Sequence, residues 1–344
     1  MAFLSDIPKF GFGTAFNIGQ GDEKTTELEF SQLLERALQL GCRHIDCAPF
    51  YQTQHLVGQV LKEAKCQVPR EEIFVTSKLP TNMMRPENID RSLKKTLNDL
   101  QLNYLDLLLI HAPFATKHVT DDQMYPLDSD GNLLIEERAS ELLEGAWLRM
   151  AELKRKGFVR YIGLSNVNLE QLNRLNTLHQ VDVAQNEYHL YNQDREFFDC
   201  CEEIDVHYEA YAAFGCPPKA KLENKPTFLS DPVVGRIARE NNLTRAQVII
   251  QWLHQQPLSY VIKSDNAAQL DENLNATKQV TLSINEMIDL DSLNQNASLY
   301  LYDHYKGLAH HPEYPFKKLL PPQPSLQSWL NERPSSTRNC LDKH

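Results

Sequence analysis

Short apolar segments alternate with segments of helical periodicity along most of this chain. The apolar segments are bounded by turn-forming residues, as strands are, and lie at 43–48, 73–79, 105–112, 159–166, 181–190, 206–214 and 259–264. A shorter segment at 10–14 precedes the first predicted helix, so that 159–166 counts as the fifth strand. Eight strand–helix units that run in one direction predict a parallel sheet.

Helix signals support this alternation. The helix predicted over 25–40 has apolar side chains on one face, and Gly41 follows where a helix C-terminus favours glycine. Further helices are predicted near 54–64, from Pro86 onward and over 139–156. Helices therefore separate successive strands along the chain.

We therefore expect an α/β fold in which the sheet closes into a (β/α)8 TIM barrel with long loops. The alternative is an open doubly wound sheet, but the chain has neither Gly-x-Gly-x-x-Gly after a first strand nor a Walker sequence. A length of 344 residues fits one barrel with loop additions, so we expect a single domain over 1–344. Residues 295–344 would form its C-terminal loop and tail, an extended segment over the C-terminal face, with His310 and His311 in solvent.

Two long loops interrupt the alternation. Segment 113–138 is rich in Asp, Pro and Gly and leaves the sheet on the same side as His111. Loops of this length inside a compact domain are usually functional, so it is a candidate substrate lid. Segment 215–230, which contains three prolines, is predicted as a second long loop.

Composition and charge exclude several classes of protein. A formal net charge of −11 argues against a broad nucleic-acid or anionic-membrane surface. No signal-like N-terminus and no apolar run of membrane-spanning length is present, so we expect a cytoplasmic protein. The 7 cysteines, without a Cys-x-x-Cys pair, indicate reduced thiols, and the histidines lack the spacing of metal ligands, so no metal is expected.

Three predicted strands end with an ionisable side chain. Asp46, Lys78 and His111 each lie where such a strand ends, and Tyr51 follows Asp46 shortly afterwards. An α/β barrel forms its active site on the C-terminal face, where the ends of its strands meet. We therefore expect these four side chains to form one catalytic group.

The group has a specific chemistry. A tyrosine phenol has a pKa of about 10, so it exchanges a proton easily at neutral pH only when a cation stabilises the phenolate. Lys78 can supply that cation and Asp46 can hold the lysine, while His111 can donate a hydrogen bond that orients and polarises a substrate carbonyl. This set suits the protonation of an oxygen as hydride reaches the attached carbon.

The sequence around these residues resembles the aldo-keto reductase family, in its aldose-reductase-like branch. The resemblance rests on Gly-Cys-Arg-His-Ile-Asp-Cys-Ala at 41–48 and extends over about residues 7–305, with further family motifs in order at 76–78, 110–111, 163–166, 185–188 and 263–264. It implies that Asp46, Tyr51, Lys78 and His111 are catalytic, with Tyr51 as general acid. The family's alkene-reducing branch has glutamate in place of the histidine, so His111 favours carbonyl reduction.

The family binds NADPH extended across the barrel, which implies a cofactor site. By similarity, Ser165, Asn166 and Gln185 would hold the nicotinamide carboxamide, and Tyr211 would stack on the ring. The other positions that the resemblance assigns to the cofactor are Gly13, Thr14, Ala15, Asp46, Ala212, Phe214, Lys263, Ser264, Gln269, Glu272 and Asn273.

The 2′-phosphate distinguishes NADPH from NADH, and a cation is the natural partner for it. By similarity Lys263 and Ser264 would meet the phosphate, and Glu272 and Asn273 the adenine. The family's arginine in this region aligns with Gln269. We therefore expect NADPH as the cofactor, with a weakened preference that leaves NADH as an alternative.

Three positions that are aromatic in the aldose-reductase branch are Ala15, Pro80 and Ala112 here. Their small size should open the pocket and remove stacking surface. Phe50, Phe114 and Trp147 are candidates to refill it. The expected substrate-binding residues are Ala15, Tyr51, Pro80, His111, Ala112 and Phe114.

The expected function is the NADPH-dependent reduction of an aldehyde or ketone to an alcohol. The partner would be a small-molecule carbonyl compound, such as an aldose, a keto sugar acid or another bulky carbonyl, and the family resemblance suggests a monomer. The alternative is a non-catalytic structural or cofactor-sensing protein on the same barrel, which turnover would exclude.

Overall fold

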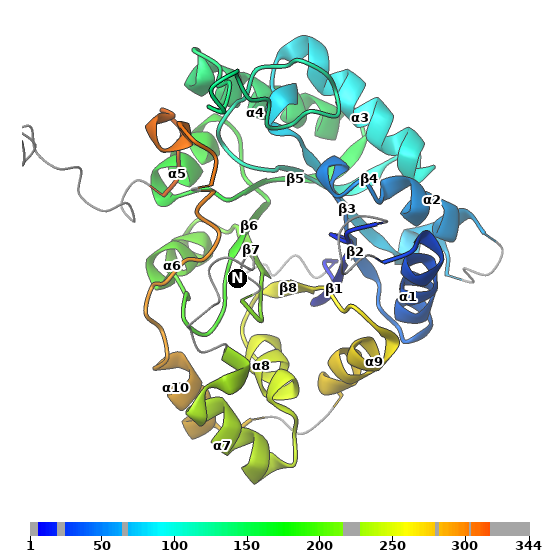
Figure 1. Ribbon diagram of the computed structural model, residues 1–344, viewed down its shortest axis with the longest axis vertical. Helices are drawn as coiled ribbons and strands as arrows, with labels where there is room; N and C mark the ends of the chain where they lie inside the picture. The colour runs from blue at the N-terminus through cyan, green and yellow to red at the C-terminus, as the bar shows by residue number, and fades with distance from the viewer. Residues whose placement is uncertain are drawn as a thin grey trace, which may run out of the picture.

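The computed structural model describes residues 6–18, 25–63, 68–215, 228–278, 282–302 and 304–316 (Figure 1). Parallel strands follow one another in sequence order around a closed barrel, and strand β1 pairs with both β2 and β8. The strands are β1 Phe10–Gly13, β2 His44–Asp46, β3 Phe74–Leu79, β4 Leu105–Ile110, β5 Val159–Ser165, β6 Val183–Glu187, β7 His207–Tyr211 and β8 Ser259–Ile262. The predicted (β/α)8 barrel is confirmed and the open sheet is excluded.

Helices surround the barrel, which Figure 1 shows along its axis. They are α1 Glu27–Gln39, α2 Gln54–Lys62, α3 Pro86–Leu100, α4 Ala139–Arg155, α5 Leu169–Leu178, α6 Arg195–Glu203, α7 Pro232–Asn241, α8 Arg245–His254, α9 Ala267–Ala276 and α10 Ile284–Asp291. Local sequence fixes their ends. Thr26 and Glu29 form a capping box at the start of α1, and Gly41 takes a φ of 95° just beyond its end, as predicted.

The main core lies between the helices and the outer face of the sheet. It includes the fully buried rings of Trp147 and Trp252. Trp147 also donates from Nε1 to the carbonyl oxygen of His179 at 3.1 Å, so it is a core residue and does not refill the substrate pocket.

The interior of the barrel is apolar at one end and polar at the other. Around the N-terminal ends of the strands it holds a separate apolar cluster, formed by Ile7, Phe74, Leu107, Leu109 and Val183. Toward the middle and the C-terminal ends of the strands it holds buried polar side chains, among them Asp46, Thr76, Lys78, Gln185 and Glu209. His44 and Ser259, the first residues of β2 and β8, are also polar and buried. Gly11 makes room for one of them, since a Cβ added there would lie 3.0 Å from Nδ1 of His44.

Segment 113–138 is irregular, as predicted, with only isolated bridges between Thr116 and Ile135 and between Leu127 and Leu133. It packs against the C-terminal segment 295–316 in an apolar cluster of Ala112, Phe114, Leu133, Leu308 and Tyr314. The C-terminal segment runs from α10 along one side of the barrel toward α5 (Figure 1).

The tail and the second predicted long loop differ from expectation or lie partly outside the described residues. His311 is fully buried, not in solvent as expected, and its Nε2 lies 3.2 Å from the carbonyl oxygen of Ala115; His310 is exposed. In the second predicted long loop, residues 216–227 lie outside the described part of the chain, and the 3-10 helix η5 Phe228–Ser230 follows.

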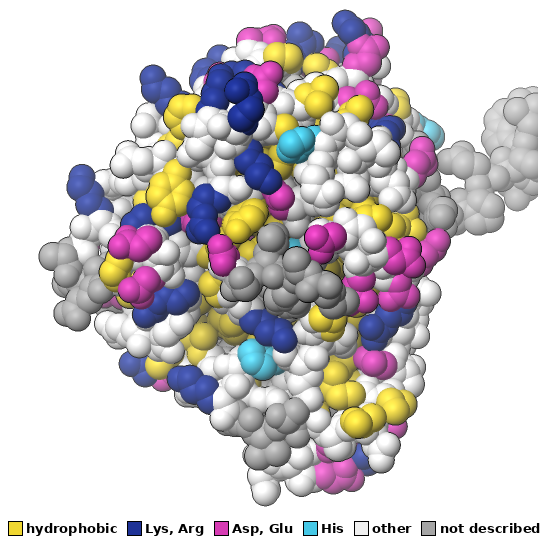
Figure 2. Space-filling model, turned by 180° about the vertical axis from the view of Figure 1, so that it is seen from behind, with side chains coloured by type: hydrophobic (Ala, Val, Ile, Leu, Met, Phe, Trp, Pro, Cys, Tyr) yellow, Lys and Arg dark blue, Asp and Glu magenta, His cyan; other side chains and the backbone are white. Residues whose placement is uncertain are grey.

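No helix in the described part of the chain is both long and apolar enough to cross a membrane. Figure 2 shows the face opposite to that of Figure 1, on which basic and acidic side chains are interspersed. On that face, therefore, charge does not form the broad basic patch that a nucleic-acid surface needs.

Candidate active site

Lys78 lies at the centre of the predicted catalytic group. Its Nζ donates to both carboxylate oxygens of Asp46, at 2.6 and 2.7 Å, and lies 3.2 Å from the hydroxyl oxygen of Tyr51. Strands β2 and β3 position the ion pair, and Tyr51 ends the 3-10 helix η1 Pro49–Tyr51, which follows β2 directly. Asp46 and Lys78 are 4% and 1% exposed, so water screens the pair little.

His111 follows β4 and faces Tyr51. The two rings are 5.9 Å apart at 88° between planes, and Asn166 donates from Nδ2 to the carbonyl oxygen of His111 at 2.8 Å. Nδ1 of His111 is buried and has no hydrogen-bond partner among the described residues. The four side chains that the sequence predicts as catalytic are thus brought together.

Burial sets the protonation of this group. It would lower the pKa of the Lys78 ammonium, but the Asp46 carboxylate and the Tyr51 phenol raise that pKa above its ordinary value. Burial raises the pKa of Tyr51, which the nearby ammonium opposes without cancelling. Burial and the Lys78 charge lower the pKa of His111 to about 3. At neutral pH the site therefore holds a protonated phenol, a charged lysine and a neutral imidazole.

The residues assigned to the nicotinamide lie together at the ends of β5, β6 and β7. Ser165, Gln185, Glu209 and Ser259 are paired in register across four neighbouring strands, from β5 to β8. The Tyr211 hydroxyl donates to Oδ1 of Asn166 at 2.6 Å, which links the ends of β7 and β5. Amide and hydroxyl groups at one level of the barrel suit the donors and acceptors of a carboxamide.

The other barrel-mouth positions assigned to the cofactor lie after β1 and β7. Thr14 is buried and donates from Oγ1 to the carbonyl oxygen of Asp46 at 2.9 Å, whereas Ala15 is exposed. Ala212 takes a φ of 60°, a conformation that alanine rarely adopts. Gly13 is buried and Phe214 is half-buried.

The residues assigned to the phosphate and adenine lie after β8 and on α9. Lys263 is exposed and pairs with Asp265, while Asn273 donates from Nδ2 to Oγ of Ser264 at 3.0 Å. Gln269 accepts from the backbone N–H of Asp265 at 3.1 Å, and Glu272 accepts from Thr244. The lysine thus fits a phosphate, but Asp265 competes for it.

Two of the predicted substrate-binding residues, Ala112 and Phe114, have no exposed surface, and Pro80 is also buried. Aromatic rings that sequence reasoning did not identify lie over Phe114. Tyr302 packs edge-on against it at 5.3 Å, and Tyr125 stacks on Tyr305 at 4.4 Å.

These tyrosines come from segment 113–138 and from the C-terminal segment. Phe50, 49% exposed, packs edge-on against Tyr125 at 5.4 Å and against His111 at 6.3 Å. Tyr125, Tyr302 and Tyr305 therefore form one aromatic cluster with Phe50 and Phe114, two residues that the sequence offers to refill the pocket. No local signal identifies the three tyrosines, because their meeting depends on contact between a loop and the tail.

Glu209 is a further residue that sequence reasoning missed. It is fully buried, accepts from Nε2 of Gln185 at 2.8 Å and from Oγ of Ser259 at 2.7 Å. A signal was present: residues two apart on a strand share a face, so Glu209 points inward with Tyr211.

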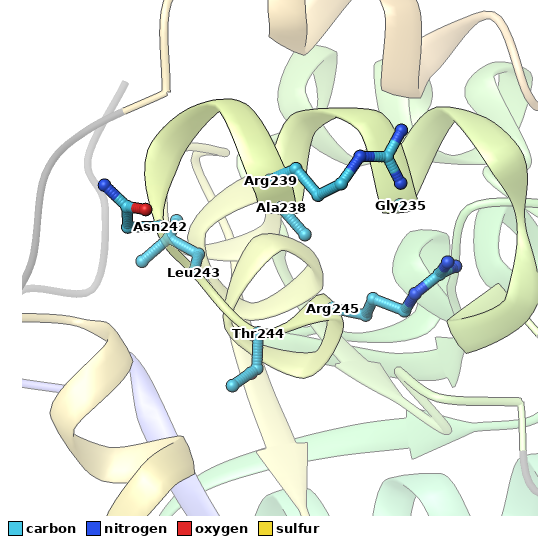
Figure 3. A pocket seen from close by; sticks show the side chains of 7 residues that line it. All are labelled: Gly235, Ala238, Arg239, Asn242, Leu243, Thr244 and Arg245. Atoms are coloured by element: carbon cyan, nitrogen blue, oxygen red, sulfur yellow. The ribbon is translucent and has the colours of Figure 1, made fainter.

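Away from the barrel mouth, the described residues offer no comparable group of catalytic side chains at the surface hollow or as a metal cluster. A surface hollow of about 450 Å³ lies between α7 and α8, lined by Gly235, Ala238, Arg239, Asn242, Leu243, Thr244 and Arg245 (Figure 3). Arg245 donates there to the carbonyl oxygens of Leu229 and Asp231, at 2.8 and 3.0 Å, and no catalytic candidate lines the hollow. Within the described ranges no cluster of His, Cys, Asp and Glu could hold a metal ion.

The structure is a closed (β/α)8 barrel in which a phenol, an ammonium, a carboxylate and an imidazole lie together after strands β2, β3 and β4. The sequence model of the aldo/keto reductase family matches residues 9–295. The chain therefore belongs to the aldo/keto reductase family, NAD(P)H-dependent carbonyl oxidoreductases, and resembles its aldose-reductase-like members.

Similar proteins cover most of the chain. It is 34% identical to aldo-keto reductase family 1 member A1 of Bos taurus, over 87% of this chain and 94% of that protein. It is 33% identical to prostaglandin F synthase 1 of Bos taurus, over 91% of this chain and 95% of that protein. The solved structure of the aldose reductase from Schistosoma japonicum matches with a TM-score of 0.78 and 31% identity, over 91% of this chain and 96% of that one.

Proposed function

We propose that this protein reduces aldehydes or ketones to alcohols, with NADPH as the cofactor and Tyr51 as the general acid. The observation that carries the proposal is the hydrogen-bonded series from the Tyr51 hydroxyl through Lys78 Nζ to the Asp46 carboxylate. When bound, the cofactor supplies the hydride that reaches the carbonyl carbon. Membership of the aldo/keto reductase family supports the same reaction class.

Each member of the catalytic group has a distinct task. Tyr51 carries its proton at neutral pH, because its pKa is raised, and can donate it as negative charge develops on the carbonyl oxygen. Lys78 stabilises the phenolate that remains, and Asp46 holds the lysine ammonium in place. Neutral His111 can donate one hydrogen bond to the same oxygen, which orients and polarises the carbonyl.

For the cofactor, Ser165, Asn166 and Gln185 would bind the carboxamide and Tyr211 the ring. Lys263 and Ser264 would bind the 2′-phosphate. The pairing of Lys263 with Asp265 leaves NADH as an alternative cofactor.

The walls of the pocket support a bulky, partly polar carbonyl substrate. Ala15 is small and exposed at the barrel mouth, and Tyr125, Tyr302 and Tyr305 offer aromatic faces together with hydroxyl groups. An aldose, a keto sugar acid and a bulky aromatic carbonyl are the substrate classes that this combination favours.

The test is the consumption of NADPH and NADH against a panel of such carbonyl compounds, with Tyr51→Phe as the matched variant. Phenylalanine keeps the ring and removes only the acidic hydroxyl. We expect turnover to fall by at least about a hundredfold, the contribution of a general acid, while NADPH affinity changes by less than about twofold. Unchanged turnover would refute the role of Tyr51.

A non-catalytic structural or sensing role predicts a different result. The wild-type protein would then bind NADPH without consuming it on any member of the panel. Such an outcome would replace the proposed function with the alternative.

A further inference from the structure

The interior of the barrel contains a hydrogen-bonded network below the catalytic group, and the proposed reaction does not use all of it. Gln185 connects the two parts. Its Nε2 lies 2.8 Å from Oδ2 of Asp46 and 2.8 Å from Oε1 of Glu209. Gln185 and Glu209 are neighbours in register on β6 and β7, so the contact is built into the sheet.

These two carboxyl groups fix the orientation of the Gln185 amide. An amide nitrogen carries two hydrogens and an amide oxygen carries none. Rotating the amide by half a turn would bring its oxygen against the oxygens of both Asp46 and Glu209, which repel it. Both hydrogens on Nε2 are therefore used inside the barrel, and Oε1, an acceptor, is the atom left for a ligand.

Glu209 is itself held in one position. Its Oε2 accepts from Oγ of Ser259 at 2.7 Å and lies 3.6 Å from Nδ1 of His44. Nε2 of His207 lies 2.9 Å from the same serine oxygen. Glu209 and Ser259 are both fully buried, so their arrangement does not depend on solvent. Strands β2, β7 and β8 thus brace this carboxyl group beneath Gln185.

We propose that Glu209 is a positioning residue for the cofactor: it orients the Gln185 amide so that Gln185 offers an acceptor to the NH2 of the nicotinamide carboxamide. The inference rests on the proposed function, because it assumes that Gln185 meets the carboxamide. Beyond the proposed function, it assigns a role to Glu209, which does not touch the cofactor. It also gives the direction of one hydrogen bond, from the carboxamide NH2 to Oε1 of Gln185.

The test compares two oxidised cofactors: NADP⁺ and its 3-acetylpyridine analogue, which keeps the carbonyl but has a methyl group in place of the NH2. Binding of each is measured by titration calorimetry, without turnover. For the wild-type protein we expect the analogue to bind about tenfold more weakly, the effect of about one lost hydrogen bond to a fixed acceptor. Equal affinity for the two compounds, within about twofold, would overturn the proposal without any variant.

Two variants of Glu209 then separate positioning from general stability. Glu209→Leu removes the acceptor that orients Gln185, so the ratio of the two dissociation constants should fall at least about threefold. Glu209→Gln has nearly the same shape and keeps an oxygen that can accept from Gln185, so the ratio should stay within about twofold of the wild-type value. A purely structural role would weaken both compounds equally and leave the ratio unchanged in Glu209→Leu, which would refute the proposal.

The outcomes also distinguish this inference from the proposed function. Wild-type protein that binds neither compound would overturn the cofactor assignment and the inference with it. Binding with the expected ratio, but turnover that survives Tyr51→Phe, would refute the proposed role of Tyr51 and support the positioning role of Glu209.

Discussion

At the scale of single residues, the proposed chemistry depends on a buried ion pair. Lys78 and Asp46 are withdrawn from water, and each compensates the charge of the other. Such a pair is costly to break, because the partner that remains is a buried, uncompensated charge. The same contact therefore supports both the proposed role of Tyr51 and the stability of the barrel.

We predict that Lys78→Met destabilises the protein as well as inactivating it. We expect the free energy of unfolding to fall by about 3–5 kcal/mol, because Asp46 loses its counter-charge. Denaturant unfolding measures the loss. The control is the double variant Asp46→Asn, Lys78→Met, which removes both charges and should recover part of it; a double variant less stable than Lys78→Met would contradict the explanation.

A second residue-scale prediction concerns the cofactor. Asp265 pairs with Lys263, so Asp265→Asn should free the lysine for the 2′-phosphate and increase NADPH affinity relative to NADH by about two- to fivefold. The gain should shrink at high salt, since both side chains are exposed. Titrations with both cofactors test it.

The matched control for that experiment is Asp289→Asn, which removes one acidic charge on α10. It should leave the ratio of NADPH to NADH affinity unchanged. An equal change in the two variants would point to net charge and contradict the specific role of Asp265.

The sequence was most informative where a residue's position follows from its own strand. Asp46, Lys78 and His111 were predicted as a group because each lies where an apolar segment ends, and parallel strands bring such ends together. Tyr125 and Tyr302 were not predicted, because both pack on Phe114 only through the contact between two irregular segments. Glu209 lies between these cases: strand alternation directs it inward, but its partners come from other strands.

At the scale of elements, the C-terminal segment is attached to the barrel by specific hydrogen bonds. Glu187, at the end of β6, accepts from the backbone N–H groups of Leu299, at 2.8 and 3.1 Å, and of Tyr300, at 3.1 Å, and from the Ser298 hydroxyl. A second attachment is Glu313, which bonds to Gln171 and Arg174 on α5. Burial would raise the pKa of Glu313, but these donors outweigh it and lower the pKa, so the carboxylate stays charged.

We therefore predict that Glu187→Ala loosens this segment. Hydrogen exchange at the amides of Leu299 and Tyr300 should accelerate by at least about tenfold, because each loses its acceptor. KM for bulky carbonyl substrates should rise, since Tyr302 would no longer be held over the pocket. The exposed Glu202, on α6, supplies the control: Glu202→Ala should change neither quantity, and a similar effect in both variants would contradict a specific anchor.

The order of elements is predictable from the sequence, but the residues of the first strand, β1, are not typical of a strand. Two of the five residues in segment 10–14 are glycine, which is depleted in strands. The structure explains the composition of β1, because the space beside Gly11 is occupied by the His44 ring. A tertiary requirement of the barrel interior therefore overrides strand propensity at this position.

At the scale of the whole molecule, buried histidines couple stability to pH. Burial and the charge of Lys78 lower the pKa of His111 to about 3, and burial lowers that of His207 to about 4 against the opposing charge of Glu209. In an unfolded chain both would titrate near about 6.5. Between about pH 6.5 and 4 the unfolded state therefore binds more protons than the folded state, and stability rises with pH.

We predict that the free energy of unfolding falls as the pH is lowered through this window, by up to about 1.4 kcal/mol per pH unit for each of the two histidines. Denaturant unfolding at a series of pH values measures the slope. His207→Gln removes one of the two groups and should flatten the slope by up to about 1.4 kcal/mol per pH unit. An unchanged slope in this variant would show that His207 does not contribute.

Ser165, Gln185, Glu209 and Ser259, which are paired in register from β5 to β8, have a consequence for the way the chain folds. Gln185 and Glu209 belong to β6 and β7, but Ser259 arrives with β8, and β8 must also pair with β1 at the other end of the chain. Contacts so distant in sequence form slowly, because a long loop must close first. During synthesis, Glu209 has no partner on β8 until about 260 residues have left the ribosome. We therefore expect the polar interior of the barrel to be completed late in folding, when β8 pairs with β7 and β1.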